Sequence, residues 1–167
     1  MRIRLLFFSL IFFFHFYSYS QNPLNKGESQ FDAGVGLSGE GIPVYIGYDY
    51  SIHRDITIGG EISGRTFREH YKLVYYRHNV IGIIGNANYH FNNLLEIDSE
   101  WDTYAGINLG FYYWDLPDLY PGDYSSGVGL GLQIGGRYYF SNNIGLNLEF
   151  SGGNIFSGGK FGVSIKF

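Results

Sequence analysis

The residues best able to do chemistry in this 167-residue chain are five histidines: His15, His53, His70, His78 and His90. A serine hydrolase needs a histidine that takes a proton from the serine and an acid that orients the histidine. None of the five stands two residues before a serine on one face of a strand, and no two have the close spacing typical of metal ligands. The histidine pattern therefore predicts no catalytic residue, no metal site and no cofactor.

The composition is poor in charge and rich in glycine and aromatic side chains. Charged residues make up 16% of the chain and aromatic residues 20%, with 25 glycines and no cysteine. Ordinary domains are about 25% charged and about 7% glycine, and each interior glycine of a helix costs roughly 1 kcal/mol relative to alanine. A helical bundle is therefore excluded. The formal net charge of −4 argues against a nucleic-acid partner, and the missing cysteine excludes a disulfide framework and a lipid anchor.

The first twenty residues differ from the rest. Arg2 and Arg4 precede an apolar run at 5–17, and Ser18, Tyr19 and Ser20 follow it. This order is typical of a secretory signal peptide, and the run is shorter than the ~20 residues that a membrane-spanning helix needs. We predict a signal peptide at 1–20, an N-terminal periplasmic lead-in at 21–29 and a single domain at 30–167.

The predicted domain is dominated by alternation of apolar with small or polar residues, which indicates β-strands. In the last segment, one face carries Phe161, Val163, Ile165 and Phe167, and the other carries Lys160, Gly162, Ser164 and Lys166. Eight segments alternate in this way, at 31–38, 44–51, 56–63, 81–91, 104–113, 128–140, 144–151 and 160–167.

One apolar face and one glycine-rich, polar face are what a strand needs when lipid lies outside a barrel and polar side chains fill it. A barrel in water would have the opposite pattern, because exposed rows of isoleucine and leucine aggregate. The sequence therefore predicts a closed eight-stranded antiparallel up-and-down transmembrane β-barrel in the cell outer membrane. Its long outward joints are expected at 66–79 and 114–124, with tight polar turns at 53–55 and 141–143. A long joint at 92–102, on the periplasmic side, is expected to hold a helical turn.

The runs 89–91, 104–110, 135–150 and 162–167 resemble the small OmpX-like and OmpA-like outer-membrane β-barrel proteins of Gram-negative bacteria. The phenylalanine-rich leader is similar to those of Bacteroidota-type members. The resemblance implies little about activity, because the family holds adhesins, structural barrels and proteins of unknown role. We predict a structural or surface-interaction role, in adhesion or envelope integrity, without enzymatic activity. The resemblance also implies that the barrel-assembly machinery recognises the C-terminal residues as an insertion signal: Phe161, Val163, Ile165 and Phe167.

The inward faces are expected to hold an ion-pair network, because an unpaired buried charge is costly. Its predicted members are Glu61, Arg65, Arg137, Glu149, Lys160 and Lys166, with Asp32 and Asp49 on the same inward rows. The favoured interpretation is a plug of ion pairs. Two alternatives stay open: a narrow or gated channel for ions or small solutes, in which Arg137 changes partner between Glu61 and Glu149, and a lipid A-modifying enzyme.

The outward joints carry the candidate contact residues. The joint at 66–79 is basic and aromatic, with Arg68, Tyr71, Lys72, Tyr75, Tyr76 and Arg77. This composition suits lipopolysaccharide phosphates or a host or phage surface ligand, besides outer-membrane lipid. Asp115, Asp118 and Asp123 lack the spacing of a calcium loop. Six aromatic residues are expected in interfacial girdles: Tyr48, Tyr50, Tyr89, Tyr113, Tyr138 and Phe140. The barrel is predicted to be a monomer.

Overall fold

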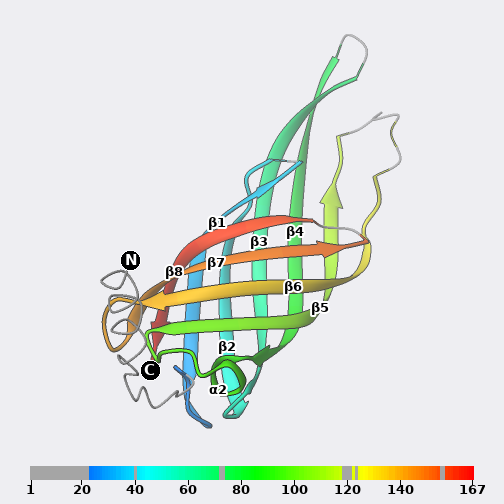
Figure 1. Ribbon diagram of the computed structural model, residues 1–167. Coiled ribbons are helices and arrows are strands. Elements are labelled where there is room, and N and C mark those ends of the chain that lie inside the picture. The colour runs from blue at the N-terminus through cyan, green and yellow to red at the C-terminus, as the bar shows by residue number, and fades with distance from the viewer. Residues whose placement is uncertain (1–22, 40, 72–73, 118–121, 123, 155–156) are drawn as a thin grey trace, which may run out of the picture.

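The structure, a computed structural model, describes residues 23–39, 41–71, 74–117, 122, 124–154 and 157–167, so the predicted signal peptide lies outside it. Eight antiparallel strands form a closed barrel in which each strand pairs with the next and β8 pairs with β1 (Figure 1). The strands are β1 (Ser29–Ser38), β2 (Val44–His53), β3 (Ile56–Tyr71), β4 (Val74–His90), β5 (Trp101–Asp115), β6 (Gly127–Tyr139), β7 (Ile144–Gly153) and β8 (Gly158–Lys166). The predicted fold class is confirmed.

The alternation in the sequence becomes an alternation in burial. In β7, exposed Ile144, Leu146 and Leu148 alternate with Gly145, Asn147 and Glu149, which are buried in the lumen. Every strand has the same inside-out arrangement, so the barrel's apolar side chains cover its outer wall. Only a surrounding apolar medium makes such an exterior stable.

The hairpin of β3 and β4 is longer than the sequence predicts. The segment 66–79 was expected to be a joint, and that prediction is wrong: the two strands remain paired from Thr66↔Asn79 to Tyr71↔Val74. In Figure 1 this hairpin rises far above the other strands. The apolar alternation ends near Ile81 because the wall beyond it lies outside the surrounding apolar medium, although the backbone pairing continues.

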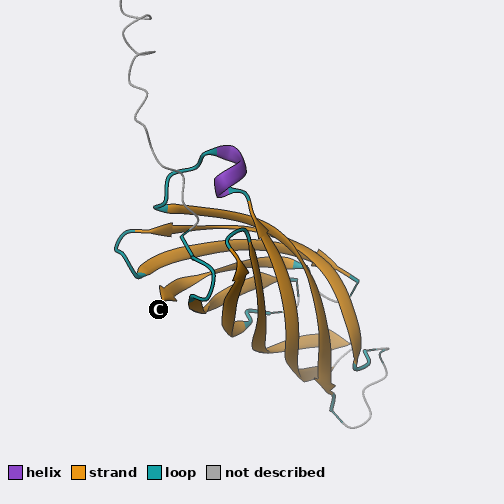
Figure 2. Cartoon of the chain, turned by 90° about the horizontal axis from the view of Figure 1, so that it is seen from below, coloured by secondary structure: helices purple, strands orange, loops and turns teal. Residues whose placement is uncertain are grey.

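The opposite end of the barrel has short turns and one helix. β2 and β3 are joined through Arg54 and Asp55, while β4 and β5 are joined by a segment that contains α2 (Asn92–Leu95), the helical turn expected there. Figure 2 shows α2 at one rim of the wall. Within the described residues, no helix is long and apolar enough to cross a membrane.

The lead-in residues pack at this end. Leu24 is fully buried, and the amide of Gly27 donates a hydrogen bond to the carbonyl of Ser51 at 2.8 Å. β1 begins at Ser29, one residue before the predicted start of the barrel.

Candidate functional site

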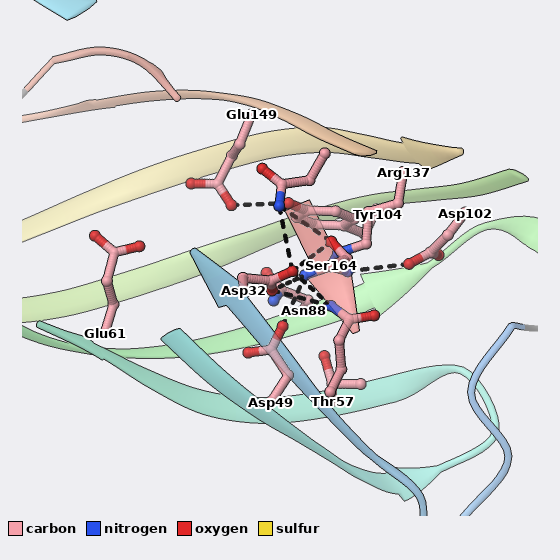
Figure 3. A network of polar contacts seen from close by, with 12 residues as sticks. Asp32, Asp49, Thr57, Glu61, Asn88, Asp102, Tyr104, Arg137, Glu149 and Ser164 are labelled. Carbon is pink, nitrogen blue, oxygen red and sulfur yellow. Dashed lines mark hydrogen bonds and ion pairs between the residues drawn. The ribbon is translucent and has the colours of Figure 1, made fainter. Parts of the chain in front are cut away.

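The lumen near the α2 end is organised around Arg137 of β6. Its Nη2 atom donates to Asp49 Oδ2 at 2.8 Å and to Asp32 Oδ2 at 3.0 Å, and its Nη1 atom donates to Asp102 Oδ2 at 3.0 Å. All four residues are buried (Figure 3). Three carboxylates from β1, β2 and β5 thus meet one guanidinium, which joins four strands across the barrel.

A histidine completes this cluster. His90 Nδ1 lies 2.6 Å from Asp102 Oδ1, and His90 Nε2 lies 3.0 Å from Thr57 Oγ1. Hydroxyl, imidazole and carboxylate are therefore connected in the order found in hydrolases. All three side chains are almost fully buried, so no substrate can reach the hydroxyl without moving the wall. Here the arrangement crosslinks β3, β4 and β5.

Tyr104 separates the Arg137 cluster from a second one. Arg137 lies 4.3 Å from the centre of the Tyr104 ring, a cation–π distance, and the Tyr104 hydroxyl donates to Glu149 Oε2 at 2.9 Å. Glu149 and Glu61 in turn contact Lys160 Nζ at 2.7 Å and 2.5 Å. Lys160 therefore pairs with two glutamates from β3 and β7, while Arg137 pairs with three aspartates.

Neutral side chains and small voids fill the rest of the middle of the barrel. Gln133 donates to Asn88 Oδ1 at 2.6 Å and accepts from Asn108 Nδ2 at 3.1 Å. Three cavities that border Lys160 measure about 20 Å³ each. Such a volume holds about one water molecule.

The outward end of the lumen holds a cluster of aromatic side chains, here called the aromatic cap. Trp114 and Tyr124 stack with ring centroids 4.4 Å apart, and Phe67 meets Trp114 edge-on at 6.1 Å. Arg65 lies over the Trp114 ring at 5.6 Å, and His78 Nε2 lies 3.4 Å from Glu69 Oε2. This aromatic cap fixes the base of the β3–β4 hairpin to the segment after β5.

The six residues predicted as one network lie in four places. Glu61, Glu149 and Lys160 form one cluster, and Arg137 forms another with the aspartates. Arg65 belongs to the aromatic cap. Lys166 Nζ donates to the carbonyl of Pro23 at 3.2 Å and lies 4.0 Å from the Tyr139 ring centre.

Sequence reasoning missed Asp102 and its connection to His90 and Thr57. Asp102 was assigned to a joint, yet it faces inward on β5 in register with Arg137. Extending the alternation of the 104–113 segment by one more inward position would have found it. Within the described part of the chain, no three His, Asp or Glu side chains form a group that could hold a metal ion.

The predicted contact residues that the structure describes lie on strands β3 and β4. Arg68 is an exposed residue of β3, opposite Arg77 on β4, and Tyr75 is 73% exposed. Tyr76 is half-buried. The side chain of Tyr71 and all of Lys72 lie outside the described residues, as do Asp118 and Asp123.

The exterior wall carries a band of exposed apolar side chains, here called the apolar belt, together with the predicted girdle residues. The four residues of the predicted insertion signal are exposed, and so are the six predicted girdle residues. Aromatic side chains also pair near the α2 end: Trp101 with Tyr138 at 4.7 Å, and Tyr48 with Phe167 at 6.2 Å between ring centroids.

Neither a family model nor a curated protein matches the chain. Solved structures do. The chain is similar to the outer membrane protein OprG from Pseudomonas aeruginosa, with a TM-score of 0.67 at 9% identity, covering 87% of this chain and 99% of that chain. It is similar to Neisserial surface protein A, with a TM-score of 0.54 at 17% identity over 83% and 93%. It is also similar to Ail of Yersinia pestis, in complex with the heparin analogue sucrose octasulfate, with a TM-score of 0.56 at 12% identity over 85% and 99%.

The fold is that of small outer-membrane barrels. The resemblance to OmpX-like and OmpA-like proteins is thus supported at the level of the fold. The apolar belt requires lipid around the wall, and closure of the sheet leaves no strand edge that lipid would have to solvate. The protein is accordingly a β-barrel of the outer membrane.

Proposed function

We propose that this protein is a non-enzymatic, non-conducting barrel that anchors the β3–β4 hairpin in the outer membrane as a surface-interaction element. The observation that carries the proposal is the hairpin itself, which is paired to its tip region at Tyr71↔Val74 and rises above the other strands (Figure 1). A rigid extension of this kind holds side chains at a fixed distance from the membrane.

The packed lumen supports a structural role for the barrel. Ions need a continuous hydrated path, whereas Arg137 and Lys160 are each held by two or more carboxylates and the aromatic cap lies beyond them. A change of partner by Arg137 to Glu61 or Glu149 would break three short contacts at once. The same packing buries Thr57, His90 and Asp102 and so supports a non-enzymatic role.

The similar structures support a surface role. Ail was solved with a heparin analogue bound, and another similar protein is a Neisserial surface protein. Sulfate and phosphate groups are ligands for arginine, and Arg68 and Arg77 are exposed on the hairpin. We propose an anionic surface as the partner class, with a host or phage surface ligand included.

Further proposals concern assembly and origin. Phe161, Val163, Ile165 and Phe167 alternate on the outer face of the last strand and are proposed as the signal for the barrel-assembly machinery. The sheet closes within one chain, which supports a monomer. The phenylalanine-rich leader and the abundance of glycine and tyrosine support a Bacteroidota-type source.

The test compares the full protein with a shortened one. Residues 68–77 are replaced by Asn-Gly, a two-residue turn that can join the register pair Phe67 and His78. We expect both proteins to migrate faster unboiled than boiled and to give no open-channel current in planar bilayers. Only the full protein, in phosphatidylcholine vesicles, should bind a heparin-coated surface or take up added lipid A. Steady channel current, or equal binding by both proteins, would overturn the proposal.

A further inference from the structure

We propose that Arg68 and Arg77 form a phosphate-binding pair for the phosphorylated headgroup of a glycolipid in the outer leaflet around the barrel. This inference rests on the proposed function and names the partner of the hairpin. The side chains concerned stand on the hairpin's outer face, which continues the lipid-facing wall below it.

The first reason is the register of the two arginines. Arg68 and Arg77 are direct cross-strand partners, and side chains so placed have Cβ atoms about 4.5–5.5 Å apart. Like charges in this arrangement destabilise a hairpin. One phosphate between two guanidinium groups removes the repulsion and accepts charge-assisted hydrogen bonds from both. The pair is thus electrostatically incomplete without an anion.

The second reason is that the described residues do not supply that anion. Among the described residues, neither side chain forms a hydrogen bond or an ion pair. Asp115, the carboxylate on the neighbouring strand, accepts a hydrogen bond from Asn79 Nδ2 at 3.1 Å. Glu69 points to the inner side of the hairpin and contacts His78. The outer face therefore keeps its positive charge.

The third reason is the height of the pair above the apolar belt. Ile81 is the last exposed isoleucine on β4, and Arg77 lies four residues beyond it. Four residues span about 13 Å along a strand, or about 10 Å along the membrane normal at a tilt of about 40°. The headgroup region is about 5–8 Å thick on each side of the hydrocarbon core. Arginine side chains reach back toward that layer, so the pair lies at the level of headgroup phosphates.

The direction in which the hairpin's outer face points favours a lipid over a soluble polymer as the ligand. It looks sideways, over neighbouring lipids, because its residues follow the same outward alternation as Ile62 and Ile83 below. Above the pair, the rings of His70 and Tyr75 lie 4.6 Å apart and form a polar-aromatic rim. A glycolipid headgroup beside the wall fits between this rim and the belt.

The test uses the full protein in phosphatidylcholine nanodiscs. Retention of added diphosphorylated lipid A is measured by native mass spectrometry and compared with retention of its dephosphorylated form. The variant is Arg68→Gln/Arg77→Gln. The control is Lys26→Gln/Arg54→Gln, which removes two positive charges from exposed residues at the opposite end. We expect the hairpin variant to bind lipid A about 25-fold more weakly, at about fivefold for each arginine, and the control to match wild type.

Three outcomes decide the inference. A loss confined to the hairpin variant and to phosphorylated lipid A supports it. Equal retention by all proteins overturns it. If Arg68→Gln/Arg77→Gln in that case fails to bind heparin, the proposed function survives, with a sulfated polysaccharide as the partner. Complete competition by millimolar inorganic phosphate also overturns it, since the site would then be one for soluble anions. Preserved heat-shifted mobility shows in every case that the barrel is folded.

Discussion

At the scale of the residue, the stability of the barrel depends on buried charges of the lumen that form ion pairs with one another. Replacing Arg137 with glutamine leaves Asp32, Asp49 and Asp102 buried without their cation. Breaking a buried pair in this way costs about 3–5 kcal/mol. We therefore expect Arg137→Gln to lower the free energy of unfolding by that amount, measured by urea titration of the barrel folded into vesicles.

Two comparisons make the Arg137 prediction specific. Lys26→Gln removes a charge from an exposed position and should stay within about 0.5 kcal/mol of wild type. Adding Asp49→Asn to Arg137→Gln removes one stranded carboxylate and should recover part of the loss. An additive double variant would show that the two side chains are not coupled.

Two adjacent glycines of β6 give a second prediction. A Cβ on Gly135 would overlap the ring of Tyr104, whereas a Cβ on Gly136, on the lipid side, would come no closer than 3.6 Å to the backbone of Asp102. Overpacking a filled interior costs about 1–3 kcal/mol. Gly135→Ala should therefore destabilise the barrel and Gly136→Ala should leave the urea midpoint almost unchanged. Equal effects would mean that the Tyr104 ring can move aside.

At the scale of the element, the turn between β2 and β3 is tied to α2 by Asp55. Its carboxylate accepts hydrogen bonds from the Asn93 amide and from Arg54 Nε at 3.3 Å. Burial raises the pKa of Asp55, but these hydrogen bonds hold the pKa below its ordinary value. A carboxyl of this kind stabilises the fold above its unfolded-state pKa, and the contribution is lost as the pH falls through the folded-state pKa.

The consequence is an acid-sensitive contribution from this turn. Asp55→Asn should lower the free energy of unfolding at about pH 6, and its difference from wild type should shrink as the pH falls below about 4. The measurement is the urea midpoint of both proteins across that range. A difference that is constant with pH would show that the introduced amide, and not the lost charge of Asp55, causes the destabilisation.

The strands also show which parts of the fold could be predicted from the sequence. The eight strands follow from alternation, because lipid outside and polar side chains inside act on every strand between Ser29 and Lys166. The upper part of the β3–β4 hairpin lies beyond the hydrocarbon core of the bilayer, so Thr66 and Arg68 take the positions that isoleucines occupy below. The sequence of this part therefore lacks the apolar alternation from which its strands could have been predicted.

The partners of buried charges were harder to predict than the faces. Alternation placed Arg137, Glu149 and Lys160 inside, but pairing across the lumen depends on barrel shear and side-chain length, neither of which is local. Arg137 reaches three aspartates, one of them on β5 beside β6 and two across the lumen on β1 and β2. One of the three aspartates, Asp102, lies outside the alternating segment predicted at 104–113.

At the scale of the whole molecule, the wall must respond to charge according to depth. Leu132 lies near the middle of β6 and is 67% exposed on the outside, while Phe140 lies just past the strand's end at the α2 rim. An arginine on the lipid face of a barrel costs about 2–4 kcal/mol at the bilayer midplane and about 0–1 kcal/mol near an interface. We expect Leu132→Arg to be much more destabilising than Phe140→Arg in vesicles.

The surrounding medium provides the decisive control for the depth prediction. Both side chains point away from the lumen, so neither variant disturbs the Arg137 or Lys160 cluster. The free energies of unfolding are compared for vesicles of the same lipid, with the unboiled band as the measure of the folded fraction. If Leu132→Arg and Phe140→Arg lower the free energy of unfolding equally, the apolar belt is not centred in the bilayer. The level of Arg68 and Arg77 relative to the headgroups would then have to be derived again.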